Sequence, residues 1–322
     1  MKNIILAALL LPFTAFSQYK LSNSYLNYDK QTSFTYENLR LYPINARDSF
    51  KLAFKNVSKF TSLKQALEQK KIVITEKGDE GTVNTLTVEN KSEDTIIINC
   101  GEVIKGGQQD RVINADMVLY PKSGKKDLAV FCVEHGRWSP RNESLGNRGT
   151  ARNGAAAFDG YSNFSAVSLR KVVEKQKDQT VVWNKVSEIN TKNKTENSTG
   201  TYTALDQSSD YTTKINKYIS SLQPKMNALK DIVGVIVVSG DKVLGADIFA
   251  THDLFIQNFE GLLHSYATEA ILNGKPVTIA QSRVDKYVND LLSNEKKQNE
   301  TLEKKGSKFV NKGDKLRISV FE

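Results

Sequence analysis

The hydrophobic and polar positions in the first half of the chain follow the two-residue period of β-strands. Residues 34–44 alternate loosely, as a half-buried strand does, and residues 71–76 predict a second strand. Between them, residues 62–65 (SLKQ) have the pattern of a capping box that opens a short helix. Four more runs, with short connections that favour an antiparallel meander, are predicted as strands at 83–89, 95–104, 109–120 and 127–134.

The second half of the chain follows the helical period instead. Apolar residues of 211–222 fall on one stripe of a helix, which Pro224 is expected to interrupt. A longer amphipathic helix is predicted at 253–272, with Asp253 as its cap, and another opens at Ser282 and continues as a Lys/Glu-rich rod. The remaining predicted strands are a hairpin at 233–238 and 243–249, and a final strand at 315–321.

These patterns predict an α+β fold, in which an antiparallel β-meander or sheet lobe is followed by a lobe built from a β-hairpin and helices. Between the two lobes the composition shifts to Arg, Asn, Gly, Ser, Thr and Lys, which indicates a long, basic and partly mobile excursion, least ordered at 191–201. The predicted parts are a signal peptide at 1–17, a β-rich lobe at 18–138, the excursion at 139–210, and an α+β lobe with a C-terminal strand at 211–322.

The first residues have the pattern of a secretory signal peptide. Lys2 precedes an apolar run at 4–16, and small residues favour cleavage between Ser17 and Gln18. An uncleaved membrane anchor needs about 20 apolar residues, whereas this run is shorter and contains Pro12. No later stretch is apolar enough to span a bilayer, so we expect no membrane span after signal cleavage. The sequence therefore predicts a periplasmic or secreted protein.

Composition and charge narrow the function further. The 322 residues include 45 Lys+Arg and 36 Asp+Glu, a formal net charge of +9 that is spread along the chain. Such a distribution favours solubility and weak attraction to polyanions, so nucleic acid is not a predicted partner. The sequence has no P-loop, Rossmann or hydrolase signature, and we predict no cofactor. We also predict no metal site, because His135, His252 and His264 are too scattered for zinc.

One charged motif lies where two predicted strands meet. Gly106 and Gly107, in the string GEVIKGGQQDR, favour a two-residue hairpin turn because glycine accepts positive φ at both positions. The register of that turn places Glu102 opposite Arg111, with Gln109 on the same face near the turn. Such a pair leaves guanidinium donors for a ligand, but it also fits a structural salt bridge that only fixes the register.

A second motif, CVEHGRW at 132–138, adds polar side chains where the fourth predicted strand ends. A register that pairs Met117 with Val130 brings Glu134 to the same polar end. Arginine and aromatic surface suit a phosphate and a stacked ring, and acids suit ribose hydroxyls or acid/base catalysis. A tryptophan that plugs the edge of the core is the alternative for Trp138. The predicted ligand-binding residues are Gln109, Arg111, Arg137 and Trp138, and the catalytic candidates are Glu102 and Glu134.

The two cysteines, Cys100 and Cys132, would suit a disulfide in an oxidising compartment. The predicted register separates them by two strands, which corresponds to about 10 Å between Cα atoms at about 4.8 Å per strand. Disulfides bridge Cα atoms up to about 7 Å apart. We therefore expect two buried free thiols.

Taken together, the two motifs resemble the ARG and Rhodanese-Phosphatase-superfamily-associated Protein domain family. Its members combine a Gly-Glu-x-x-x-Gly-x-x-Gln-(Asp/Asn)-Arg element with a later Cys-Val-Glu-x-Gly-Arg-Trp, as this chain does at 101–111 and 132–138. The chain differs at Gly107, where the family commonly has Ala, and in its signal sequence and long tail after Leu272. The family's name records an association with ADP-ribosylglycohydrolases and phosphatases, so the resemblance implies ADP-ribose-like compounds as the first ligands to test.

Two functions follow from these observations. The first is a ligand-binding domain, with or without hydrolase activity, for an anionic small molecule that is phosphorylated or contains a nucleoside. The second is a non-catalytic envelope module that contacts a protein partner through the basic stretch 137–196, which has eleven Lys/Arg and six Asp/Glu. Deletion of 191–201 separates the two, because only the second function depends on that stretch.

Overall fold

The computed structural model describes residues 20–30, 33–78, 81–139 and 156–322. The predicted signal peptide and its cleavage site between Ser17 and Gln18 lie outside the described residues. The fold is α+β and is built from mainly antiparallel sheets and helices, as the sequence predicts. Within the described ranges, no helix has the length and apolar character needed to cross a membrane.

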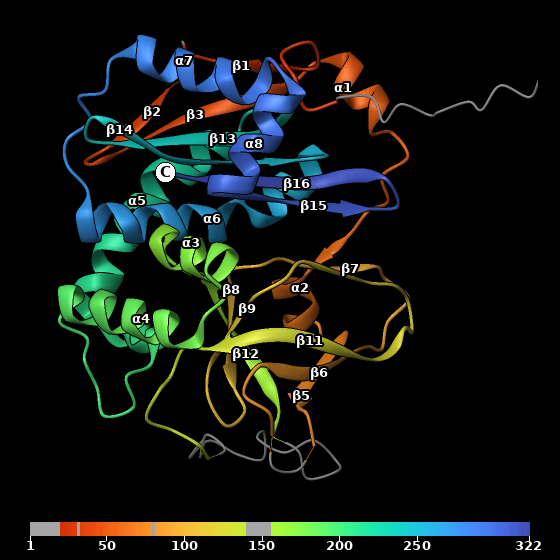
Figure 1. Ribbon diagram of the computed structural model, residues 1–322, viewed down its shortest axis with the longest axis vertical. Helices are drawn as coiled ribbons and strands as arrows, with labels where there is room; N and C mark the ends of the chain where they lie inside the picture. The colour runs from red at the N-terminus through yellow and green to blue at the C-terminus, as the bar shows by residue number, and fades with distance from the viewer. Residues whose placement is uncertain (1–19, 31–32, 79–80, 140–155) are drawn as a thin grey trace, which may run out of the picture.

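The larger sheet has seven strands and forms the upper part of the molecule in Figure 1. Its strands are β1 (Leu26–Tyr28), β2 (Phe34–Tyr36), β3 (Leu39–Ala46), β13 (Ile232–Ser239), β14 (Lys242–Phe249), β15 (Gly306–Asn311) and β16 (Asp314–Phe321). The predicted hairpin β13–β14 lies at the centre, and the C-terminal strand β16 pairs with β14, as expected. All eight residues of β13 are buried, so both faces of the sheet are covered at this central strand.

Several helices pack around the larger sheet. They are α1 (Asp48–Ala53), α5 (Ser209–Asn227), α6 (His252–Asn273), α7 (Gln281–Leu292) and α8 (Glu295–Lys305). Three sequence expectations need correction. Thr251, not Asp253, caps α6, because its side chain accepts a hydrogen bond from Leu254 N. Pro224 lies inside α5, whose last turn is held by buried packing at Met226. The rod expected after Ser282 is two helices, because the Asn294 side chain caps α8.

The lower part of Figure 1 contains two smaller sheets. Their strands are β4 (Thr61–Ser62), β5 (Ile72–Glu76), β6 (Thr85–Asn90), β7 (Ile96–Ile98), β8 (Glu102–Gly106), β9 (Arg111–Ile113), β10 (Met117–Leu119), β11 (Gly124–Cys132) and β12 (Phe158–Phe164). One sheet has the order β12-β8-β9-β11-β6-β5, and the other has the order β10-β7-β4. The runs predicted at 95–104 and 109–120 are therefore each divided into two strands. The capping box of Ser62 and Gln65 opens α2 (Leu63–Glu68), as predicted.

The predicted register of the β8–β9 hairpin is wrong by two residues. Ile104 pairs with Arg111, so Glu102 and Arg111 are not opposite each other. Gly106 and Gly107 do have positive φ values of 134° and 48°, but the loop is wider than a two-residue turn. The reason is local: the Asp110 carboxylate accepts a hydrogen bond from Gly106 N at 3.1 Å and closes a larger loop. The expected pairing of Met117 with Val130 is also wrong, because Val130 pairs with Ile113.

The stretch 139–210 contains more regular structure than its composition predicts. Beyond β12 it forms α3 (Val167–Lys175), α4 (Gln179–Asn193) and the 3₁₀ helix η1 (Tyr202–Gln207). The part expected to be least ordered, 191–201, includes the last residues of α4 and the segment that follows it. The Asn190 side chain holds this segment by donating a hydrogen bond to Thr201 O at 2.9 Å. Polar residues here are used in buried hydrogen bonds, which composition alone does not reveal.

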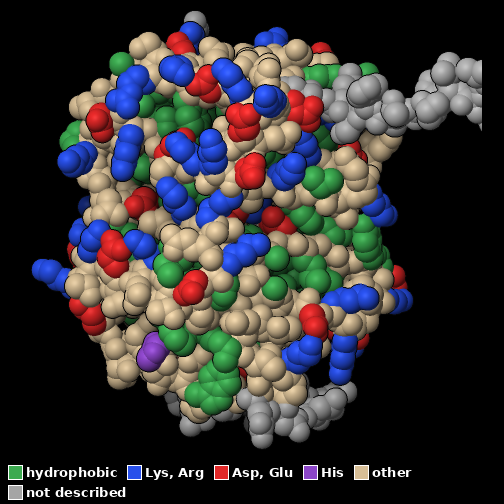
Figure 2. Space-filling model, in the orientation of Figure 1, with side chains coloured by type: hydrophobic (Ala, Val, Ile, Leu, Met, Phe, Trp, Pro, Cys, Tyr) green, Lys and Arg blue, Asp and Glu red, His purple; other side chains and the backbone are tan. Residues whose placement is uncertain are grey.

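The parts of the molecule share their interior. One core cluster includes Val103 from β8, Val186 from α4 and Ile236 from β13, so the lobe boundaries drawn from the sequence stay a prediction. On the face that Figure 2 shows, Lys and Arg side chains are interspersed with Asp and Glu side chains. This mixture agrees with the spread of charge along the sequence.

Candidate functional site

Arg111 is the centre of a buried polar network at the end of the smaller six-stranded sheet. Its Nη2 lies 3.3 Å from Glu76 Oε1, and its Nη1 donates to Gln109 O at 2.8 Å. The rings of Trp138 and Phe158 lie 5.8 and 5.9 Å from its guanidinium carbon. The Arg111 side chain has no exposed surface, so its charge is balanced by one carboxylate and two aromatic rings.

The Arg137 side chain lies against the loop at Gly106 and Gly107 and donates to its carbonyl oxygens. Its Nη1 donates to Gly107 O and Ser139 O, both at 2.7 Å, and its Nη2 donates to Gly106 O at 3.1 Å. The same Nη2 forms an ion pair with Glu134 at 2.6 Å. These contacts explain why a charged residue follows the fourth predicted strand, because it satisfies carbonyl oxygens that the loop leaves without partners.

Asp110 connects this loop to the 3₁₀ helix η1. Its Oδ2 accepts hydrogen bonds from Thr201 Oγ1 at 2.9 Å and from Thr203 Oγ1 at 2.6 Å, while its backbone N–H donates to Glu134 Oε2 at 3.0 Å. We call the set of interacting residues the Arg111 network; its members are Glu76, Gln108, Gln109, Asp110, Arg111, Glu134 and Arg137. It ties together β5, the β8–β9 loop, the segment after β11, and η1.

Trp138 covers the network and faces solvent. One side of its indole lies over the Arg111 guanidinium, yet 49% of the residue surface is exposed. A tryptophan that plugs the edge of a hydrophobic core would be buried, so this alternative does not describe Trp138. An exposed ring held against a fixed cation offers a flat apolar surface to a ligand.

The Arg111 network leaves hydrogen-bonding capacity unused. Within the part of the chain that the structure describes, four of its buried polar atoms have no partner: Glu76 Oε2, Gln108 Oε1, Arg111 Nε and Arg137 Nε. A second buried network, in which Arg170 and Arg317 pair with acids, also has two unpaired Nε atoms, but none of its carboxylate oxygens is unpaired. Buried acceptors without donors are rare, so Glu76 and Gln108 distinguish the Arg111 network from the second one.

Two carboxyl groups of this network differ in their affinity for a proton. Burial raises the pKa of Glu76 above its ordinary value, and the charge of Arg111 only partly opposes this effect. Burial also acts on Glu134, but hydrogen bonds from Arg137 and from the Asp110 N–H outweigh it and lower the pKa of Glu134. A carboxyl with a raised pKa beside one with a lowered pKa is an arrangement that suits acid/base chemistry.

The structure brings together five of the six residues predicted from the sequence: Gln109, Arg111, Glu134, Arg137 and Trp138. Glu134 reaches the network although the predicted register was wrong, because an even-numbered shift keeps it on the same face. Glu102 is not part of the network. It is buried, and its carboxylate accepts hydrogen bonds from Asn99 N at 2.6 Å and Tyr161 Oη at 3.0 Å. Burial raises the pKa of Glu102 to about 7.

Sequence reasoning missed Glu76 and Asp110. Glu76 ends β5, and alternation along that strand places it on the same face as the buried Ile72 and Ile74. A carboxylate on an apolar strand face signals a buried partner, but it does not say which cation supplies the charge. No group of three or more His, Cys, Asp and Glu side chains within the described ranges is arranged to hold a metal ion.

The two cysteines are free and buried, as predicted. Cys132 pairs with Arg111 across β9 and β11, and burial raises the pKa of its thiol to about 11. Such a thiol stays protonated at neutral pH and is a poor nucleophile.

Comparison with known proteins agrees with the two motifs and with the extent of the fold. No curated protein and no solved structure matches the chain. A family model matches residues 27–320, which include nearly all of the three sheets and every helix named above. The chain belongs to the ARG and Rhodanese-Phosphatase-superfamily-associated Protein domain family.

Proposed function

We propose that this protein binds a phosphorylated or nucleoside-containing small molecule, with ADP-ribose-like compounds first, on the surface formed by Trp138 and the Arg111 network. The observation that carries the proposal is the half-exposed indole of Trp138 above the fully buried guanidinium of Arg111. A base or ribose face stacks on such a ring, and stacking on an aromatic side chain contributes about 1–3 kcal/mol per base.

The unpaired atoms of the network supply the polar complement. Ligand phosphate oxygens would accept hydrogen bonds from the Nε atoms of Arg111 and Arg137, and ligand hydroxyls would donate to Glu76 Oε2 and Gln108 Oε1. Glu76 thus takes the role that the sequence suggested for Glu102. The other donors of both arginines bond to protein groups, so each guanidinium offers one nitrogen to a phosphate.

Hydrolase activity would use Glu76 and Glu134. Water would form the new bond as the bond to the leaving group breaks; Glu76, whose pKa is raised, would give a proton to the leaving group, and Glu134, whose pKa is lowered, would accept a proton from the water. A periplasmic or secreted location, with an anionic ligand met outside the cytoplasm, is part of the proposal and rests on the signal pattern.

A thermal-shift screen of the mature protein with ADP-ribose, NAD, AMP and ribose 5-phosphate tests the proposal. A ligand at 100 times its Kd stabilises the protein by about 2.7 kcal/mol, which is large enough to raise the melting temperature measurably. Trp138→Ala should abolish the shift. Tyr120→Ala removes another exposed aromatic residue, 38% exposed, and should leave the shift intact.

Two results would count against the proposal. One is a shift that survives Trp138→Ala, which would place the ligand elsewhere. The other is the absence of a shift with all four compounds, which would favour the envelope interaction module and its basic stretch 137–196.

A second measurement separates binding from hydrolysis. Chromatography of each compound after incubation with the protein shows whether the compound is recovered intact or cleaved.

A further inference from the structure

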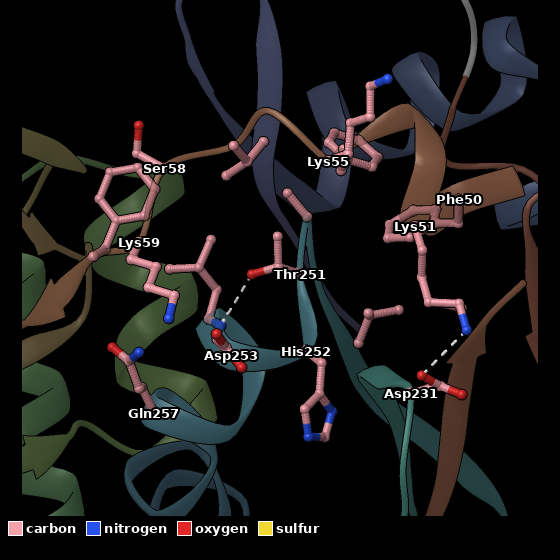
Figure 3. A pocket seen from close by; sticks show the side chains of 17 residues that line it. Phe50, Lys51, Lys55, Ser58, Lys59, Asp231, Thr251, His252, Asp253 and Gln257 are labelled. Atoms are coloured by element: carbon pink, nitrogen blue, oxygen red, sulfur yellow. Dashed lines mark hydrogen bonds and ion pairs between the residues drawn. The ribbon is translucent and has the colours of Figure 1, made fainter. Parts of the chain in front are cut away.

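A pocket that shares no residue with the Arg111 network lies between α1 and the start of α6 (Figure 3). Its wall comes from α1, from the segment 54–60 that follows it, and from the ends of β13 and β14 near the first turn of α6. The cavity has a volume of about 290 Å³. Ligand pockets usually measure about 300–1,000 Å³, so this one suits a small molecule.

One side of the pocket is apolar. Phe50, Phe54 and Phe60 line it, with Leu254 of α6. The three phenylalanines are 1%, 3% and 7% exposed, so they are held in the core and form a fixed wall. Such a wall favours an apolar ligand group, which gains about 25 cal/mol per Å² of surface removed from water.

The polar groups gather on the opposite side. Figure 3 shows the Lys59 ammonium, the Asp253 carboxylate and the Gln257 amide close to one another. Neither Lys59 nor Asp253 forms an ion pair with a described residue, whereas Lys51 is paired with Asp231 at 3.4 Å. Gln257 Oε1 is buried and has no donor in the described part of the chain. This side of the pocket therefore presents a cation and an anion that form no ion pair with a described residue, together with an unsatisfied acceptor.

We propose that this pocket binds a small zwitterion with an apolar side chain, such as a free apolar α-amino acid. The ligand carboxylate would pair with Lys59, beside the first N–H groups of α6, which lack helical acceptors. The ligand ammonium would pair with Asp253 and donate to Gln257 Oε1, and the side chain would lie against the phenylalanines. In an α-amino acid the carboxylate and the ammonium are attached to the same carbon. The two charged side chains of the protein likewise lie on one side of the pocket, so both ion pairs can form together.

Isothermal titration calorimetry of the mature full chain with L-phenylalanine and L-leucine tests this assignment. We expect heat of binding for at least one of them. 3-Phenylpropionate, which lacks the ammonium, and 2-phenylethylamine, which lacks the carboxylate, should each bind at least about tenfold more weakly than L-phenylalanine, because each leaves one charge of the pocket without a partner.

Variants of the protein complete the test. Lys59→Met and Asp253→Asn should each raise the Kd by about tenfold or more, with circular dichroism confirming that the variants fold. Lys55→Met is the matched control, since Figure 3 shows that side chain directed away from the other polar groups, and it should leave the Kd unchanged. The assignment is overturned if neither amino acid binds, if 3-phenylpropionate binds as tightly as L-phenylalanine, or if Lys55→Met weakens binding as much as Lys59→Met.

Discussion

Arg111 forms its ion pair with Glu76, which lies 35 residues away in sequence, and not with Glu102 on the neighbouring strand. Nη2 of Arg111 and Oε1 of Glu76 are 3.3 Å apart, and the two side chains are 0% and 1% exposed. Glu76 also accepts a hydrogen bond from Gln108 N at 2.8 Å, so the pair holds the β8–β9 loop against the end of β5. The charged motif thus fixes the loop on which Trp138 and Arg137 pack.

Removing one partner of this buried pair should strongly destabilise the protein. Arg111→Ala leaves the Glu76 carboxyl buried without its cation, and we expect the free energy of unfolding to fall by about 3–5 kcal/mol. Lys77→Ala removes the exposed pair with Asp127 and should cost less than about 1 kcal/mol. Urea unfolding followed by circular dichroism measures both. Similar losses for the two variants would show that the Arg111 pair contributes no more than a surface pair.

Gly106 should tolerate a side chain less well than another glycine of positive φ. A Cβ at Gly106 would lie 2.5 Å from the carbonyl oxygen of Ala157, whereas a Cβ at Gly124 would have no atom within 4 Å. Both alanine variants incur backbone strain of about 1–3 kcal/mol. Gly106→Ala should cost about 1–3 kcal/mol more, because β12 must move away. Equal unfolding free energies for the two variants would contradict the close contact between Gly106 and Ala157.

Glu102 should make the stability of the protein depend on pH. Burial raises its pKa from 4.5 to about 7 in the folded state, so the folded protein holds a proton that the unfolded chain releases. The free energy of unfolding therefore falls as the pH rises from about 4.5 to about 7, by about 3 kcal/mol from this group.

Glu102→Gln is neutral at every pH and isolates this contribution. The free energy of unfolding of Glu102→Gln minus that of the wild type should be about 3 kcal/mol larger at pH 8 than at pH 4.5. Chemical denaturation at several pH values measures the difference, and Glu303→Gln, which changes an exposed carboxylate, serves as the control. A constant difference between wild type and Glu102→Gln across this range would refute the raised pKa.

Both thiols should be unreactive in the folded protein. Cys100 and Cys132 are 3% and 0% exposed, and burial raises the pKa of Cys132 to about 11. A thiol reagent such as 5,5′-dithiobis(2-nitrobenzoate) at pH 8 should find no thiol in native protein and two after unfolding in guanidinium chloride. Rapid labelling of the native protein, or fewer than two thiols after unfolding, would be inconsistent with two buried free cysteines.

The mature protein should begin at Gln18 and should be exported in soluble form. Intact-mass analysis of protein from the native host is expected to show loss of residues 1–17, with the amino-terminal glutamine open to cyclisation. Substitution of the small residue at the predicted cleavage site by a bulky one, as in Ser17→Trp, should slow processing. Recovery of protein that retains Met1 would rule out this processing.

Local patterns in the sequence were enough to predict many of the elements. Strand-like runs bounded by turn residues predicted β5, β13, β14 and β16, and the helical period predicted α5 and α6. The capping box at Ser62 and the positive φ values of Gly106 and Gly107 also depend only on neighbouring residues, so the sequence predicted them correctly. Five of the six candidate residues lie together although the predicted registers are wrong, because a register shift by an even number of residues leaves each side chain on the same face of the sheet.

The charge partners and the order of strands were decided by the tertiary structure. Arg111 meets Glu76 because β9 lies beside β11 and Asp110 widens the preceding loop, and neither fact follows from residues near Arg111. Likewise, the polar residues of 191–201 look mobile by composition, but Thr201 bonds to Asp110, which lies 91 residues earlier in the chain. The periods of strands and helices are local and are therefore written in the sequence, whereas the pairing of buried polar groups depends on which distant segments burial brings into contact.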